Sequence, residues 1–102
     1  MYQEPVTFIV PAGMTNMRKR VARQFKRLEK QVVTGRRVTW KVLDTFFNST
    51  FRDWKIQNSA VDQHTGGKEF IERWWHAYFV PRFNALERAK LAQGRRLAGH
   101  GR

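Results

Sequence analysis

TNMRKRVARQFKRLEKQVVTGRR, residues 15–37, is the stretch that decides the fold expected for this chain. Its apolar side chains recur at spacings of four, four, three and four residues, at Met17, Val21, Phe25, Leu28 and Val32. This spacing is the period of one face of an α-helix. Thr15 or Asn16 could accept hydrogen bonds from the first free amides of the helix, and Gly35 is a natural stop. The stretch therefore predicts an amphipathic helix that ends before Gly35.

The opposite side of this predicted helix is strongly basic. Its centre carries cations at spacings of four, three and four residues, at Lys19, Arg23, Lys26 and Lys30, and its flanks carry Arg18, Arg20 and Arg27. Like charges four residues apart destabilise a helix by a few tenths of a kcal/mol per pair. The stretch has one acidic residue, Glu29, to offset them. A face that keeps this repulsion usually meets an anion.

The rest of the chain predicts more helix around an aromatic core. A second helix is expected from about Thr39, with apolar residues at Trp40, Val42, Leu43, Phe46, Phe47, Phe51 and Trp54. So broad an apolar face is typical of a helix buried on most sides. We therefore expect this helix at the centre of the core. Gln57 to Gly67 is polar, ends in two glycines and is expected to be a loop.

A third helix is expected from about Lys68. Its aromatic face comprises Phe70, Ile71, Trp74, Trp75, Tyr78 and Phe79. Pro81 either kinks this helix or begins a fourth, because proline lacks an amide donor and disfavours helical geometry before it. A weaker apolar stripe continues to about Gln93, and Val6–Val10 has the β-branched and aromatic composition of a strand.

These segments predict a mainly α fold, a small single-domain bundle of three or four helices with a short N-terminal strand or extended arm. The domain is expected to cover residues 1–93, followed by a flexible basic C-terminal tail over residues 94–102. A chain of 102 residues is long enough for one such core.

The charge of the chain is concentrated in two places. It has 20 Lys and Arg against 8 Asp and Glu, a net charge of +12. Residues 15–37 hold nine basic residues and one acidic residue, and residues 94–102 add three arginines. The apolar content of 41% is too high for a disordered polycation. The uneven distribution points to a basic helix mounted on a nearly neutral core.

Several function classes are disfavoured because the sequence lacks the residues that they need. There are no cysteines, which excludes a disulfide scaffold, a thiolate nucleophile and a cysteine-ligated metal site. Glu72 and His76 lie four residues apart but have no third ligand nearby in sequence, so no metal and no cofactor are expected. No arrangement of catalytic residues is visible, and an enzyme is the least favoured class.

The cellular compartment is inferred from the lack of a membrane-spanning segment and of a secretory signal. No run of 18 apolar residues occurs, and the N-terminal apolar stretch follows no basic residue, unlike a secretory signal. We expect an intracellular, cytoplasmic protein without a membrane partner, or one that reaches a host cell through a virus or mobile element.

The favoured hypothesis is a non-catalytic nucleic-acid-binding protein, an accessory subunit or regulator in a nucleoprotein assembly. The residues expected to contact DNA or RNA phosphates are Arg18, Lys19, Arg20, Arg23, Lys26, Arg27, Lys30, Arg36, Arg37, Arg95 and Arg96. Lys and Arg with few Asn or Gln favour backbone contacts over base contacts. We therefore expect weak sequence specificity.

Two features leave other partners open. Adjacent tryptophans should not both point into one core, so Trp74, Trp75 and Tyr78 are expected to form an interface with a larger protein complex or a second copy. Stacking of exposed bases on these rings is the less favoured interpretation. The alternative function is a small viral or mobile-element protein that binds and inhibits or modulates a larger protein machine. Membrane-surface binding by the basic helix is disfavoured because its apolar stripe resembles a core stripe.

Overall fold

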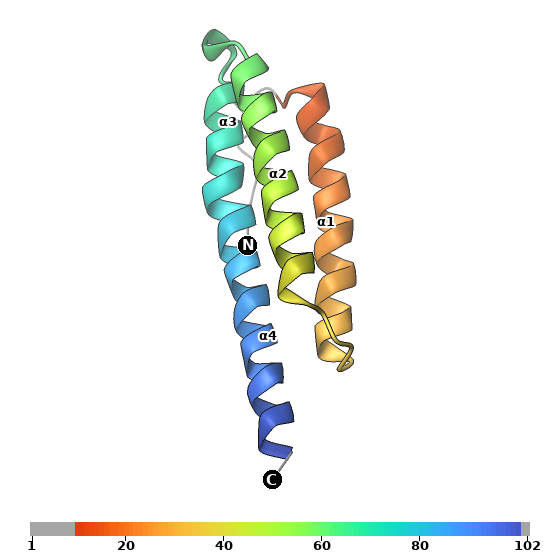
Figure 1. Ribbon diagram of the computed structural model, residues 1–102. Coiled ribbons are helices and arrows are strands. Elements are labelled where there is room, and N and C mark those ends of the chain that lie inside the picture. The colour runs from red at the N-terminus through yellow and green to blue at the C-terminus, as the bar shows by residue number, and fades with distance from the viewer. Residues whose placement is uncertain (1–9, 101–102) are drawn as a thin grey trace.

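Three long helical segments, each antiparallel to the one before it in the chain, make up the computed structural model, which describes residues 10–100 except the side chains of Thr65 and residues 95–100 (Figure 1). Helix α1 spans Ala12–Val33 and α2 spans Trp40–Ala60. The third segment is continuous and consists of α3 (Gly67–Trp74), the π-helical turn η2 (Trp75–Phe79) and α4 (Val80–His100). The predicted mainly α fold is confirmed. The described part contains no strand, and the predicted strand lies outside it except for Val10, which packs against the core.

Helix α1 begins earlier than the sequence predicts and ends where it predicts. Its first residue is Ala12, and the N-cap is Pro11, whose carbonyl accepts from the Thr15 amide at 3.0 Å. The expected cap at Thr15 or Asn16 is wrong, because the helix already begins at Ala12 and no side chain caps its first amides. At the other end Gly35 has φ +82°, and the Arg36 amide donates to the Gln31 carbonyl at 2.8 Å. These bonds form a Schellman motif, which requires the left-handed conformation at the glycine.

Helix α2 begins as expected and ends later than expected. The Thr39 hydroxyl accepts from the Val42 amide at 3.2 Å, which confirms the predicted helix start. The predicted loop from Gln57 is wrong in its first part, because α2 continues to Ala60. The remaining connection contains a short 3₁₀ turn, η1 (Gln63–Thr65), capped by the Asp62 carboxylate on the His64 amide at 2.9 Å.

The core lies along the axis between the three segments. Helix α1 buries Met14 and the whole predicted stripe, and the third segment buries Phe70, Ile71, Trp74, Trp75, Phe79, Phe83 and Leu86. Helix α2 buries Leu43, Phe46, Thr50 and Trp54. Trp40, Val42 and Phe51 remain 38–44% exposed, so the expectation that α2 is central is wrong. In a three-helix bundle each helix has two neighbours, which cover less than the apolar face that α2 presents.

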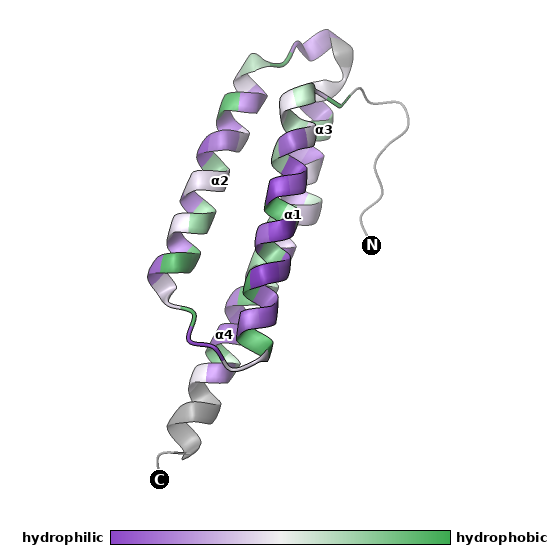
Figure 2. Ribbon diagram, turned by 90° about the vertical axis from the view of Figure 1, so that its right-hand side faces the viewer, coloured by the Kyte–Doolittle hydropathy of each residue, from purple (hydrophilic) through white to green (hydrophobic). Residues whose placement is uncertain are grey.

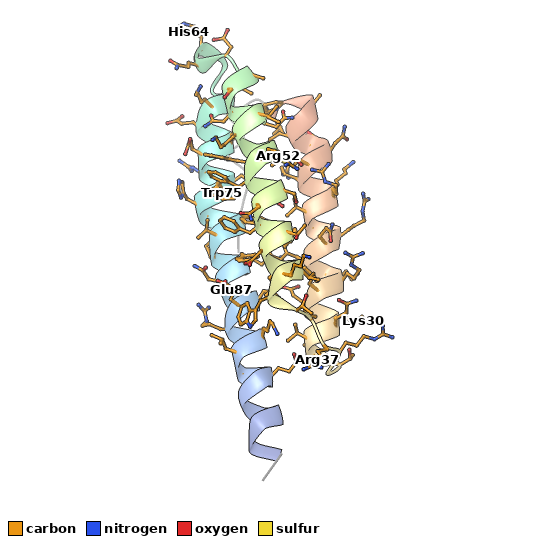
Figure 3. All side chains as sticks on the ribbon, in the orientation of Figure 1. Lys30, Arg37, Arg52, His64, Trp75 and Glu87 are labelled. Carbon is orange, nitrogen blue, oxygen red and sulfur yellow. The ribbon has the colours of Figure 1, made fainter. Side chains whose placement is uncertain are left out.

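The π-helical turn explains how two adjacent tryptophans are both buried. The Val80 amide donates to the Trp75 carbonyl, five residues back, as in a π-helix. Trp75 faces α2 and contacts the rings of Phe47 and Trp54, with centroids 5.6 and 5.1 Å away (Figure 3). Trp74 lies on the side that faces α1.

The expectation that Trp74 or Trp75 reaches the surface is therefore wrong, with 2% and 5% of these residues exposed. Neighbouring residues in a helix point about 100° apart. The two tryptophans therefore pack against different helices. Pro81 comes directly after the π-helical turn and does not end the helix, which continues to His100.

Helix α4 continues beyond the bundle (Figure 1). We expected it to end near Gln93, with a tail from Gly94, but the helix extends to His100. One exposed helical glycine costs about 1 kcal/mol, and most of the residues after Gly94 are good helix formers. The buried Gln93 amide donates to the carbonyls of Val32 at 3.1 Å and Arg36 at 3.3 Å. It thereby ties α4 to the end of α1.

Candidate nucleic-acid interface

The outward side of α1 carries a row of exposed cations. We define the basic face as Lys19, Arg23, Lys26 and Lys30, all of which are exposed, whereas the apolar stripe of α1 is buried. Figure 2 shows hydrophilic residues along the length of α1. At about 1.5 Å per residue, Lys19 to Lys30 spans about 17 Å. None of these four side chains forms a hydrogen bond or an ion pair with another residue in the part of the chain that the structure describes. The structure thus places these four predicted residues together.

The three flanking arginines differ from the basic face in their contacts. Arg20 forms an ion pair with Asp53 of α2, which offsets its charge. Arg27 is exposed and donates to the Gln24 side chain at 2.7 Å. Arg18 lies on the side toward α3, with its guanidinium 5.4 Å from the centre of the Phe70 ring. Arg27 therefore extends the basic face, whereas Arg18 and Arg20 already serve contacts between helices.

The single acidic residue of α1 does not neutralise the basic face. Both carboxylate oxygens of Glu29 accept from Arg82 of α4, from Nε at 3.2 Å and from Nη2 at 3.1 Å. The Arg82 guanidinium also lies 5.3 Å from the centre of the Phe25 ring. The hydrogen bonding that Arg82 donates to Glu29 raises the pKa of Arg82 above its ordinary value. Glu29 is thus engaged between α1 and α4.

The turn between α1 and α2 continues the positive surface. Arg36 and Arg37 are exposed there, and Figure 3 shows Lys30 and Arg37 at this same end of the bundle. The Schellman motif and the Gln93 bonds hold the backbone of the turn. Arg95 and Arg96 belong to the helical extension of α4, and their side chains lie outside the description.

Acidic side chains lie away from this surface. Asp53 and Glu29 face neighbouring helices, Asp62 caps η1, and Glu72 accepts from Asn58 at 2.9 Å. Arg52 is exposed on α2 and lies outside the basic face. The described part therefore concentrates unpaired positive charge on the outside of α1 and the turn that follows.

Other kinds of site have little support among the described residues. His76 Nε2 lies 3.5 Å from a carboxylate oxygen of Glu72, and both side chains are largely exposed. No group of three or more metal-ligating residues occurs in the described part of the chain. None of the helices there is both long enough and apolar enough to cross a membrane.

Comparisons of the chain with protein-family models, curated proteins and solved structures gave no match. Interpretation of the site therefore depends on its own geometry and charge.

Proposed function

We propose that this protein is a non-catalytic nucleic-acid-binding protein that contacts phosphates through the basic face of α1. The observation that carries the proposal is the row of four exposed cations without partners among the described residues. Nucleic acids present phosphates at a spacing of several ångströms, so a row of about 17 Å can meet several of them. Arg27, Arg36 and Arg37 extend the same surface, which fits an accessory subunit or regulator in a nucleoprotein assembly.

The side chains available on α1 favour contacts with the nucleic-acid backbone. Base recognition usually uses bidentate Asn, Gln or Arg side chains on base edges. The Gln24 side-chain oxygen already accepts from Arg27. The basic face consists of three lysines and one arginine, which suits phosphates better than bases. We therefore propose binding with weak sequence specificity.

The test is a fourfold neutralisation of the basic face to glutamine. On duplex DNA, the slope of log affinity against log salt should become shallower by about 3.6, because each neutralised phosphate contributes about 0.9. The control neutralises exposed cations elsewhere, with K41Q, R52Q, K55Q and R88Q combined. It removes the same formal charge but should change the slope by less than about one contact. Far-UV circular dichroism checks that both variants fold.

Two outcomes would contradict the proposal. If the salt slope becomes shallower by the same amount in the two variants, net charge, and not the basic face, drives binding. If the wild-type chain binds neither duplex DNA, single-stranded DNA nor RNA at low salt, the proposed function is wrong. A protein partner that stays bound after nuclease treatment would then favour the alternative function, in which this protein modulates a larger protein machine.

A further inference from the structure

Gln93 of α4 is a buried polar residue beside the turn that carries Arg36 and Arg37. Gln93 is 6% exposed, and Thr50 is the other buried polar residue in the described part of the chain. Burial of an amide costs free energy unless the amide is hydrogen-bonded. The Gln93 amide donates to two backbone carbonyls, those of Val32 at 3.1 Å and Arg36 at 3.3 Å. Both bonds connect α4 to the point where α1 passes into the turn.

The two bonds differ in what they add to the structure. The Val32 carbonyl also accepts from the Gly35 amide at 3.2 Å, so the Schellman motif holds it without Gln93. The Arg36 carbonyl lies beyond that motif and accepts from Gln93. The Arg36 amide donates to the Gln31 carbonyl of α1 at 2.8 Å. Arg36 is therefore tied to α1 through its amide and to α4 through its carbonyl.

This arrangement fixes the backbone from which two exposed cations project. Arg36 and Arg37 are exposed, and neither side chain forms a hydrogen bond or an ion pair with another described residue. Val38, the next residue, is buried and anchors the other end of this short stretch. A flexible turn would have to be ordered when its arginines meet phosphates, and ordering a backbone costs conformational entropy. A turn that is already held loses less of this entropy on binding.

We propose that Gln93 is a positioning residue for nucleic-acid binding, because its amide holds the turn in the conformation in which Arg36 and Arg37 contact phosphates. This inference rests on the proposed function and adds to it a residue that touches no phosphate itself. Arg36 and Arg37 supply the charge, whereas Gln93 reduces the entropy that binding costs. Loss of the Gln93 amide should therefore weaken binding although every cation remains.

The test removes the Gln93 amide and measures whether the two arginines then contribute less. Q93M keeps an unbranched side chain of similar length that cannot donate a hydrogen bond. Fluorescence anisotropy with a labelled short DNA duplex gives the affinities of the wild type, Q93M, R36Q/R37Q and the combined variant. Q93M should bind about fivefold more weakly than the wild type, since part of the backbone order of one residue is lost. The affinity lost through R36Q/R37Q should be about fivefold smaller in Q93M than in the wild type, because Q93M has already weakened the same contacts.

I71V is the matched control for stability. Ile71 is fully buried in α3, at the opposite end of the bundle from the turn (Figure 1), and loss of one methyl group there destabilises the core to a similar extent. I71V should leave the affinity unchanged, and R36Q/R37Q should weaken binding as much in I71V as in the wild type. All affinities are measured at a temperature where circular dichroism shows each variant folded. If Q93M does not fold, Q93N replaces it, because its shorter side chain cannot reach both carbonyls.

The outcomes separate this inference from the function on which it rests. If R36Q/R37Q costs the same affinity in Q93M as in the wild type, Gln93 only stabilises the fold and the inference is wrong. Equal weakening of binding by Q93M and I71V also overturns it, because reduced stability would then explain both. If R36Q/R37Q binds like the wild type while neutralisation of the basic face abolishes binding, the inference is wrong and the proposed function stands. If the wild-type chain binds no nucleic acid, both are wrong.

Discussion

Replacement of Asp53 by asparagine should strengthen nucleic-acid binding while it weakens the fold. The carboxylate of Asp53 pairs with Arg20, which lies beside the basic face on α1. D53N keeps the shape of the side chain and removes its charge. Arg20 then becomes free to contact a phosphate, and the bundle loses an ion pair between α1 and α2.

The size of each effect follows from the exposure of the pair. The side chains of Arg20 and Asp53 are 51% and 39% exposed, so solvent screens their attraction. Pairs of this kind contribute about 0.2–1 kcal/mol to the free energy of unfolding. One additional phosphate contact steepens the salt dependence on duplex DNA by about 0.9, which corresponds to about eightfold tighter binding at 0.1 M salt.

The assay combines binding at several salt concentrations with urea denaturation of the free protein. Asp44 provides the control, because it is exposed on the same helix and has no ion pair within the described residues. D44N removes the same charge and should change affinity less than about twofold, since it frees no cation. If D53N and D44N show the same salt slope as the wild type, Arg20 does not reach the nucleic acid. The expectation that Arg20 supplies one more phosphate contact would then be wrong.

Further predictions concern stability and can be checked by thermal and chemical denaturation. E29Q should lower the free energy of unfolding by about 1 kcal/mol or less, because it breaks a half-exposed bidentate pair with Arg82; an unchanged Tm would show that the pair contributes nothing. Q93L should cost about 1 kcal/mol, because the Arg36 carbonyl loses its side-chain donor while the Val32 carbonyl still accepts from the Gly35 amide, and wild-type stability would mean that water replaces the Gln93 amide. G35A should cost about 1–2 kcal/mol because φ is +82° with open space around the glycine. G94A should add up to about 1 kcal/mol of helix stability, and the reverse order of these two glycine effects would contradict the assigned backbone conformations.

Most of helix α1 and the start of α2 could be predicted from sequence because their signals are local. The apolar spacing, the stop at Gly35 and the cap at Thr39 each depend on residues within one or two turns. The grouping of Lys19, Arg23, Lys26 and Lys30 followed from the same periodicity. Helix geometry alone places such residues on one side, whichever partners the helix acquires in the bundle.

The remaining features depend on contacts between segments distant in sequence. Arg20 precedes its ion-pair partner Asp53 by 33 residues. No pattern in the sequence around Arg20 therefore indicated that this cation is paired. The burial of both Trp74 and Trp75 required knowledge of two neighbouring helices and of the π-helical turn. The centrality of α2 was overestimated because apolar content shows what a helix could bury and not how many neighbours it has.

The placement of the acidic residues separates the stability of the bundle from the charge of its binding surface. Three like-charged pairs four residues apart remain on α1, Lys19–Arg23, Arg23–Arg27 and Lys26–Lys30. Together they cost about 1 kcal/mol in the free protein. Glutamates on α1 would remove this cost but would also lower the affinity for phosphates. The chain instead directs Glu29 and Asp53 to the contacts between helices, where they stabilise packing and leave the centre of the basic face uncompensated. The aromatic core and these ion pairs therefore offset the repulsion, and a polyanion bound as proposed would relieve it directly.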